Sequence, residues 1–202
     1  MTTPIKPSEP TARACYSPRM DEALAFAAQA FRHRRRKGSD TPYLCHLLQV
    51  ATWVGEWGGD EDQIIAGLLH DYLEDIEGGS EAELAGHFGR RVSGLVAALS
   101  DTMVRPKPPW RERKERYLAQ LRGEPAEVKL VSACDKLHNA RSILRDLAVI
   151  GDALWSRFTA SKDETLWYYE TASEALADGW PHPLTDELFE AVQRMQAMAA
   201  QR

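Results

Sequence analysis

The chain has 202 residues, of which 44% are hydrophobic and 27% are charged, and its formal net charge is −5. This length and composition are typical of an ordinary globular protein with its own hydrophobic core, and they exclude a disordered chain. The net negative charge argues against a nucleic acid as the partner, and no apolar run approaches the ~20 residues that cross a membrane. The three cysteines lie far apart and match no zinc or disulfide motif, which favours a cytoplasmic location.

An N-terminal arm is predicted over residues 1–19, because four prolines occur there with little apolar periodicity. The folded domain is expected to occupy residues 20–202. Its first helix begins near Met20 and ends at a basic cluster, which has the sequence RHRRRK over residues 32–37. Such a concentration of positive charge in an acidic chain suits a small anionic ligand.

Two apolar helices are predicted next, and both carry candidate functional residues. The first spans residues 41–57, stops at a glycine pair and has His46 in its first turns. The second spans residues 61–73 and is apolar on most sides, so it is expected at the centre of the molecule. It carries His70 and Asp71 at its end.

The rest of the chain is also predicted to be helical, with prolines, glycines and capping motifs between the helices. Ser80 with Glu83, and Ser161 with Glu164, have the spacing of a capping box at a helix N-terminus. The sequence shows neither a strand pattern nor an internal repeat. The further helices are expected over residues 80–88, 91–99, 110–121, 126–150, 161–177 and 185–198. The chain is therefore predicted to fold as a single-domain, all-α bundle of about nine helices.

The segment HDYLED places four ionisable side chains at the end of a strongly apolar helix, over residues 70–75. Burying such a cluster costs free energy unless the groups have partners or a function. His70 and Glu74 are four residues apart, as are Asp71 and Asp75, so a continuing helix would place all four on one surface. A lone His-Asp pair is more often only solvated. Its combination with an acidic pair, and with polar residues in two other apolar helices, favours a functional site.

A divalent metal ion needs more ligands than two neighbouring residues supply. His46 and Asp135 are the candidates, because each lies in an apolar helical context where an unpaired polar group is costly. With His70 and Asp71 they form a set of two imidazoles and two carboxylates, which favours one Mn²⁺ ion over a closed structural zinc site. Such an ion activates water for attack on phosphorus, while the acidic pair formed by Glu74 and Asp75 would handle protons. His138 points to a different face from Asp135 and is expected to pack or to support a ligand.

Four segments carry a resemblance to a known family. They are RRRKGSDTPYLCHLLQVA, AGLLHDYLEDI, HFGRRVSGLV and VKLVSACDKLHNARSI. In order and spacing they resemble the HD hydrolase domain of the RelA/SpoT family, especially its stand-alone small alarmone hydrolases, over about residues 21–145. The resemblance implies Mn²⁺-dependent removal of pyrophosphate from the 3′ position of the guanine nucleotides ppGpp and pppGpp.

The resemblance also implies roles for individual residues. The residues that match metal ligands are His46, His70, Asp71 and Asp135, and those that match the catalytic acidic pair are Glu74 and Asp75. The residues that match nucleotide contacts are Arg36, Lys37, Asn139 and Arg141. Arg113 and Lys114 occupy a basic helix that relatives place near the pyrophosphate, and surface solvation is the alternative. Tyr169 is a further site candidate, with packing between helices as the alternative.

Two other functions stay open at this stage. The same ligands could serve an HD phosphohydrolase that acts on another nucleotide or on the 2′-phosphate of NADPH. A protein that senses a nucleotide without catalysis could also hold the metal, although the complete ligand set and the acidic pair argue against it. The sequence predicts no particular oligomeric state.

Overall fold

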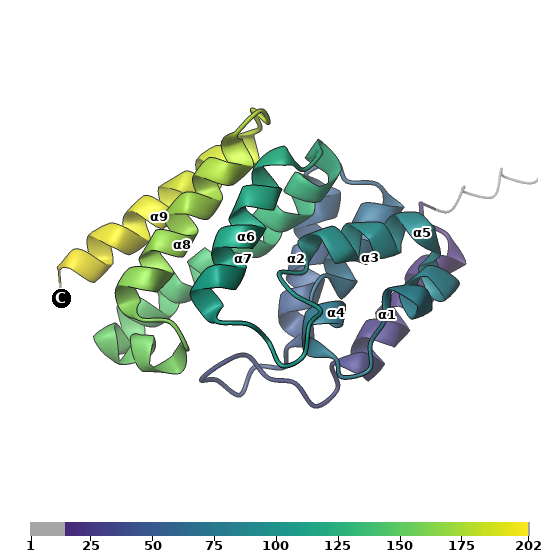
Figure 1. Cartoon of the computed structure of the whole chain (residues 1–202), viewed down its shortest axis with the longest axis horizontal. Coiled ribbons are helices and arrows are strands. Elements are labelled where there is room, and N and C mark those ends of the chain that lie inside the picture. The colour runs from purple at the N-terminus through teal and green to yellow at the C-terminus, as the bar shows by residue number, and fades with distance from the viewer. Residues whose placement is uncertain (1–14, 202) are drawn as a thin grey trace, which may run out of the picture.

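The computed structural model describes residues 15–201, so residues 1–14 of the predicted N-terminal arm lie outside the described part. Within residues 15–201 the chain forms nine α-helices and one 3₁₀ helix, and the β-structure there is limited to an isolated bridge between Arg35 and Pro42. The prediction of an all-α fold is confirmed (Figure 1). The helices are α1 (Pro18–Ala30), α2 (Leu44–Glu56), α3 (Glu61–Leu69), α4 (Tyr72–Asp75), α5 (Glu81–Leu99), α6 (Trp110–Gly123), α7 (Ala126–Ile150), η1 (Gly151–Arg157), α8 (Lys162–Ala177) and α9 (Pro183–Ala200). None of the helices in the described part combines the length and the apolar character needed to cross a membrane.

The long helix α7 joins the two halves of the molecule. It contacts α2, α3 and α5 in the N-terminal half, and η1, α8 and α9 in the C-terminal half. Figure 1 shows α1 to α5 on one side of it and the α8–α9 pair on the other. Fourteen of its 25 residues are buried. Its bounds agree with those predicted, because Pro125 precedes it and Gly151, with a φ of 59°, ends it.

Helix α1 begins at Pro18, two residues before its expected start, because Ser17 caps its N-terminus. The Ser17 hydroxyl accepts a hydrogen bond from the Arg19 N–H and donates one to the Glu61 carboxylate at the start of α3. Arg19 also pairs with Asp62 of α3 at 2.8 Å. These contacts attach α1 to α3.

Helix α3 lies at the centre of the N-terminal half, where it packs against α1, α2, α5 and α7. Its predicted burial is confirmed, since Ile65 and Leu69 are fully buried. Its predicted end at residue 73 is wrong, because the helix stops at Leu69 and the chain makes a turn at His70 and Asp71 before α4. The His70 ring Nδ1 hydrogen-bonds to the Gly67 carbonyl at 2.8 Å. In a continuing helix the Asp71 N–H would use this acceptor, so the ring competes with the helix.

The two predicted capping boxes have different outcomes. At Ser161 both reciprocal hydrogen bonds with Glu164 form, as predicted. At Ser80 the hydroxyl accepts from the Glu83 N–H, but the Glu83 carboxylate accepts from the Tyr72 hydroxyl and does not return to Ser80. The break predicted between residues 88 and 91 is a kink inside α5 at Gly89, which has a φ of 85°.

Gly67 marks a close approach between α3 and α2, the helices that bring His70 and His46 together. A Cβ placed on Gly67 would lie 3.1 Å from the Ala51 Cα. We expect Gly67→Val to lower the free energy of unfolding by about 1–3 kcal/mol, because the added methyl groups overpack this contact. Gly94→Val, on the exposed face of α5, is the matched control, since a Cβ at Gly94 meets nothing within 4 Å. Denaturant unfolding measures both variants, and equal stabilities would contradict the tight packing of α2 on α3.

Candidate active site

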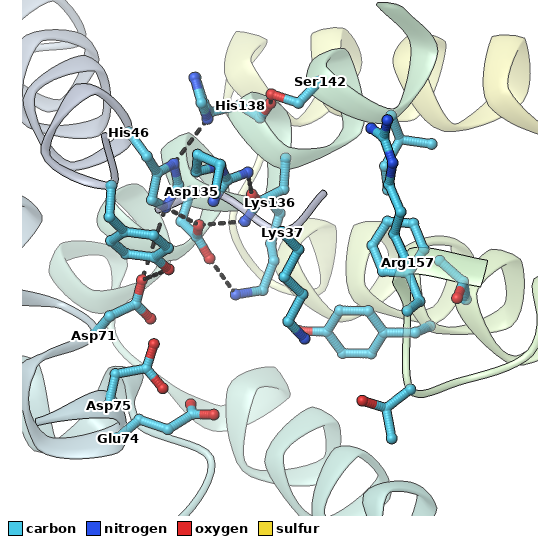
Figure 2. Close-up of a pocket in the computed structure, with 18 of the residues that line it drawn as sticks. Lys37, His46, Asp71, Glu74, Asp75, Asp135, Lys136, His138, Ser142 and Arg157 are labelled. Carbon is cyan, nitrogen blue, oxygen red and sulfur yellow. Dashed lines mark hydrogen bonds and ion pairs between the residues drawn. The ribbon is translucent and has the colours of Figure 1, made fainter. Parts of the chain in front are cut away.

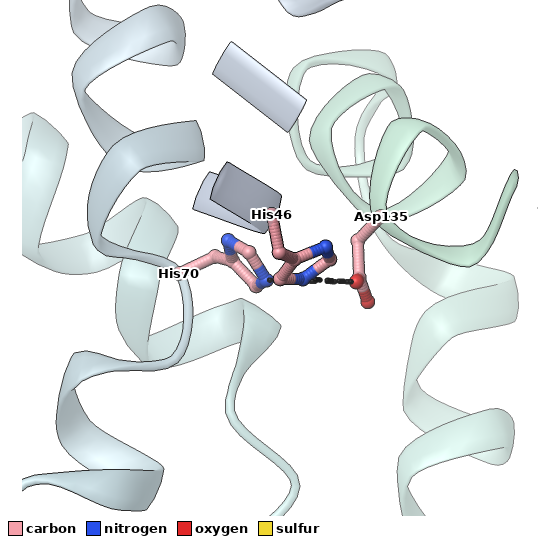
Figure 3. Close-up of side chains that lie close together, drawn as sticks. All are labelled: His46, His70 and Asp135. Carbon is pink, nitrogen blue, oxygen red and sulfur yellow. Dashed lines mark hydrogen bonds and ion pairs between the residues drawn. The ribbon is translucent and has the colours of Figure 1, made fainter. Parts of the chain in front are cut away.

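Two imidazole nitrogens and one carboxylate oxygen from separate parts of the chain lie close together (Figure 3). Nε2 of His46 in α2 lies 3.2 Å from Nε2 of His70, which follows α3. Oδ1 of Asp135 in α7 lies 3.2 Å from His46 Nε2 and 3.5 Å from His70 Nε2. All three side chains are buried, and their donor atoms lie within 4.8 Å of one another. The three groups are therefore close enough to share one metal ion.

Asp71, the fourth predicted ligand, lies at the edge of this cluster. Its Oδ2 is 2.9 Å from His70 Nε2 and 3.8 Å from His46 Nε2. The Tyr43 hydroxyl donates a hydrogen bond to the same oxygen at 2.6 Å. The structure thus brings the four predicted ligands to one place, with Tyr43 fixing the orientation of the outermost one.

The groups behind the two imidazoles orient their Nε2 lone pairs toward the cluster. The Gly67 carbonyl can only accept, so His70 Nδ1 donates to it and Nε2 of the neutral ring is left as an acceptor. Nδ1 of His46 lies 2.8 Å from Nδ1 of His138, whose ring also contacts Trp53. With His46 as the donor in this pair, its Nε2 is likewise an acceptor. His138 therefore contacts a predicted ligand without entering the cluster.

Burial and neighbouring charges shift the pKa values within the cluster. Burial opposes protonation of His70, but the Asp71 and Asp135 carboxylates raise its pKa well above the ordinary value. Burial lowers the pKa of His46, and Asp135 offsets this only in part. Burial also opposes ionisation of Asp135, yet Lys136 and the two imidazoles hold the pKa of its carboxyl well below the ordinary value. The carboxylates thus favour a positive charge at the His70 ring, and a divalent cation that displaces the His70 proton fits this donor set of imidazoles and ionised carboxylates.

Two side chains of α7 hold Asp135 in place. Lys136 Nζ pairs with Asp135 Oδ2 at 2.6 Å, and Asn139 Nδ2 donates to Oδ1 at 2.6 Å. Arg36 of the basic cluster donates in turn to Asn139 Oδ1 at 2.6 Å. Two predicted nucleotide contacts therefore lie together beside a predicted ligand. Lys136 was not predicted, because adjacent residues on a helix point about 100° apart, but the long lysine stem reaches back to the preceding carboxylate.

A cavity of about 940 Å³ opens beside the cluster (Figure 2). This volume is within the range of small-molecule sites. The predicted site residues that line the cavity are Arg36, Lys37, His46, His70, Asp71, Glu74, Asp75, Arg113, Lys114, Asp135, Asn139 and Tyr169.

Arg141 is the predicted site residue that does not line this cavity. Its guanidinium pairs with Glu187 of α9 at 2.7 Å and lies 5.0 Å from the centroid of the Trp53 ring, in a separate groove. At about 100° per residue, Arg141 stands about 240° around α7 from Asp135, whereas Asn139 stands about 40° from it. The predicted nucleotide contact of Arg141 therefore does not fit this structure.

Glu74 and Asp75 of α4 lie at the cavity wall near the cluster (Figure 2). Lys107, in the loop before α6, lies 2.9 Å from Glu74 Oε1 and 3.5 Å from Asp75 Oδ1. Arg105 of the same loop donates a hydrogen bond to the Glu74 carbonyl at 2.5 Å. Burial raises the pKa of the Glu74 carboxyl, and the ammonium groups of Lys114 and Lys107 offset this only in part. Glu74 is thus a stronger proton acceptor than a surface glutamate, which suits general base catalysis.

A buried carboxylate holds Arg113 and Lys114 in place. Lys114 Nζ lies 2.7 Å from Asp101 Oδ2, and Arg113 donates to the same oxygen. Arg113 is only 8% exposed, which excludes the alternative that this side chain is merely solvated at the surface. The Lys114 ammonium also lies 4.9 Å from the centroid of the Tyr168 ring, at the cavity wall. Asp101 was not predicted, because a single aspartate after a helix has no sequence pattern and gains its role only when α6 packs beside it.

Residues 23–165 match the family model described as the HD domain. The match covers most of the chain and includes the turn at His70 and Asp71, as well as His46 and Asp135. The chain therefore belongs to the HD domain family.

Within this family the chain is similar to proteins named guanosine-3′,5′-bis(diphosphate) 3′-pyrophosphohydrolase MESH1. The relative from Xenopus tropicalis is 35% identical over 158 residues, which are 77% of this chain and 81% of that protein. The relative from Homo sapiens is 35% identical over 159 residues, with the same coverage of 77% and 81%. A solved structure described as a metazoan orthologue of SpoT that hydrolyses ppGpp has a TM-score of 0.74 and 28% identity, covering 90% of this chain and 97% of that one. The resemblance noted in the sequence is confirmed.

We expect His46→Ala, His70→Ala and Asp135→Ala each to lose bound divalent metal, because each removes one of three donors that meet at one point. Mass spectrometry of metal content after gel filtration is the measurement. The melting temperature should fall as well, since an ion that binds the folded state stabilises it. His87→Ala is the control, because this histidine pairs with Glu22 on the surface. A variant that kept the full metal content would remove its residue from the site.

Proposed function

We propose that this protein is a Mn²⁺-dependent (p)ppGpp 3′-pyrophosphohydrolase, which releases GDP or GTP together with pyrophosphate. It is an enzyme of the HD phosphohydrolase class. The observation that carries the proposal is the position of the metal-ligating cluster beside Glu74 and Asp75, at the wall of a large cavity that also contains basic side chains. Membership of the HD domain family and the 35% identity to relatives named for this reaction support the substrate.

One divalent ion per chain is held, in this proposal, by His46, His70, Asp71 and Asp135. The mixed nitrogen and oxygen donors favour Mn²⁺. When bound, the ion supplies a Lewis acid that neutralises phosphoryl charge and lowers the pKa of water. Asn139 and Lys136 keep the Asp135 carboxylate in place, so that Oδ1 faces the two imidazoles.

The acidic pair of α4 handles protons at the phosphorus under attack. Glu74 accepts the proton of the attacking water, since burial raises the pKa of its carboxyl. Asp75 orients the same water. Lys107 lies between the two carboxylates and holds them in one geometry. With Lys114 it also provides positive charge where the pyrophosphate leaves.

The nucleoside binds, in this proposal, beside the metal site. Arg36 and Asn139 are joined by a hydrogen bond and both line the cavity. Arg36 also lies 5.5 Å from the centroid of the Tyr43 ring, which limits the movement of the guanidinium.

We place the enzyme in the cytoplasm, because its three cysteines are free thiols in the structure.

With Mn²⁺ present, ppGpp should yield GDP and pyrophosphate in equal amounts. Water attacks the phosphorus bound to the 3′ oxygen and the bond between these two atoms breaks, so the diphosphate is released whole and the nucleotide keeps a 3′-hydroxyl. Anion-exchange chromatography of the products is the measurement. The substrate assignment would be contradicted if inorganic phosphate were the primary product. It would also be contradicted if ppGpp were inert while NADPH or another nucleotide was cleaved rapidly. Binding of ppGpp to the metal-loaded protein without turnover would favour a nucleotide sensor.

Glu74→Gln should keep the native metal content while turnover falls by about 10²–10⁴-fold, as expected for loss of a general base. In the unsubstituted enzyme the base must be ionised, so kcat/KM should rise with pH through the raised pKa of Glu74. The acid limb should therefore lie above the ~4.3 of a free glutamate. Glu112→Gln, on the exposed face of α6, is the matched control. Near-normal turnover in Glu74→Gln would exclude this role.

A further inference from the structure

The cavity wall opposite the metal-ligating cluster is formed by the segment between α7 and α8, from which Arg157 projects (Figure 2). Arg157 is the last residue of η1, and its Nη1 donates to Asp146 Oδ2 at 3.1 Å. Its side chain is 25% exposed, so the guanidinium is held in place and still open to the cavity. Asp146 lies eleven residues after Asp135 on α7. This spacing puts both carboxylates on one face of the helix, about 16 Å apart along its axis.

Positive charge is in excess at this end of the cavity. Lys37, Arg145 and Arg157 face a single carboxylate, that of Asp146, which pairs with both arginines. Lys37 joins none of the ion pairs formed within residues 15–201. At the opposite end the cations and carboxylates balance, as Lys107, Arg113 and Lys114 face Glu74, Asp75 and Asp101. An anionic group of the ligand is therefore favoured near Arg157.

Arg157 also packs on the loop that carries Arg36 and Lys37. A Cβ placed on Gly38 would overlap the Cγ, Cδ and Nε atoms of Arg157. Gly38 has a φ of 68°, so glycine is required there both for its backbone conformation and for this close approach. The contact joins the loop before α2 to the segment after α7, and it bounds this end of the cavity.

We propose that Arg157, together with Lys37, binds the 5′-diphosphate of the nucleotide and makes the enzyme specific for a nucleotide phosphorylated at both its 3′ and 5′ positions. The inference rests on the proposed function, which puts the 3′-diphosphate beside the acidic pair of α4. The second diphosphate then extends along α7 toward Asp146. A planar guanidinium matches phosphate oxygens through two parallel hydrogen bonds, and Asp146 keeps it oriented.

The direct test compares two substrates, ppGpp and guanosine 3′-diphosphate with a free 5′-hydroxyl. Arg157→Gln should raise KM for ppGpp by about tenfold to a hundredfold, the range for loss of a hydrogen bond to a charged group, with little change in kcat. KM for the 5′-hydroxyl substrate should not change. Arg122→Gln removes the same charge at the exposed end of α6 and should alter neither value. Equal increases of KM for both substrates in Arg157→Gln would overturn the proposal.

A matched pair of glycine variants tests the same contact without removing the arginine. Gly38→Ala and Gly179→Ala impose the same backbone strain, because the φ angles are 68° and 67°. Only the Gly38 variant displaces Arg157, since a Cβ at Gly179 meets nothing within 4 Å. Gly38→Ala should therefore raise KM for ppGpp severalfold and Gly179→Ala should not. Equal KM values for the two variants would contradict the proposal.

Titration calorimetry with GDP separates this proposal from the proposed function, because GDP carries the 5′-diphosphate but no scissile 3′ group. The unsubstituted protein should bind GDP at least tenfold more tightly than Arg157→Gln, whether or not ppGpp is hydrolysed. Equal GDP affinities would overturn the role of Arg157. Loss of GDP affinity in the variant, combined with absence of ppGpp hydrolysis in the unsubstituted protein, would overturn the proposed function alone.

Discussion

The structure depends on the convergence of buried ligand atoms where α2, α7 and the turn after α3 meet. Nε2 of His46, Nε2 of His70 and Oδ1 of Asp135 lie 3.2–3.5 Å from one another. Burial of such groups costs several kcal/mol unless protons or a cation compensate their lone pairs and charge. A bound divalent ion provides that compensation and stabilises the folded state by linkage. The interruption of α3 after Leu69 and the close contact at Gly67 both serve this convergence, since they bring His70 next to His46.

Helix α7 connects this centre to the rest of the cavity. Its middle part carries Asp135 and Asn139, and its C-terminal part carries Asp146 on the same face. Residues from both halves of the molecule line the cavity. The net charge differs between the two ends of the cavity. Near the metal site Glu74 and Asp75 offset the cations, whereas at the other end the single carboxylate of Asp146 faces an excess of cations. This polarity gives an extended anionic ligand one preferred direction of binding.

Local sequence signals predicted the helix bounds well where no side chain from elsewhere competes for the backbone hydrogen bonds. Helix α7, which lies between Pro125 and Gly151, is an example. These signals failed at the end of α3, because the His70 ring is a competing donor to the Gly67 carbonyl, and the periodicity of the sequence does not encode this side-chain hydrogen bond. The ligand cluster was predicted from polar residues in apolar helices, and the structure brings those residues together. Lys136 and Asp101 were not predicted, since their roles depend on side-chain reach and on packing between elements. The expectation for Arg141 rested on the family resemblance, and the helical phase of α7 turns this residue away from the cavity.

The most direct test of the central claim is an anomalous difference map from a crystal grown with Mn²⁺ and measured on both sides of the manganese absorption edge. The account predicts one strong peak within coordination distance of His46 Nε2, His70 Nε2 and the carboxylates of Asp71 and Asp135. A map without a peak at this point, with the imidazoles hydrogen-bonded directly to the carboxylates in crystals that contain the ion, would contradict it.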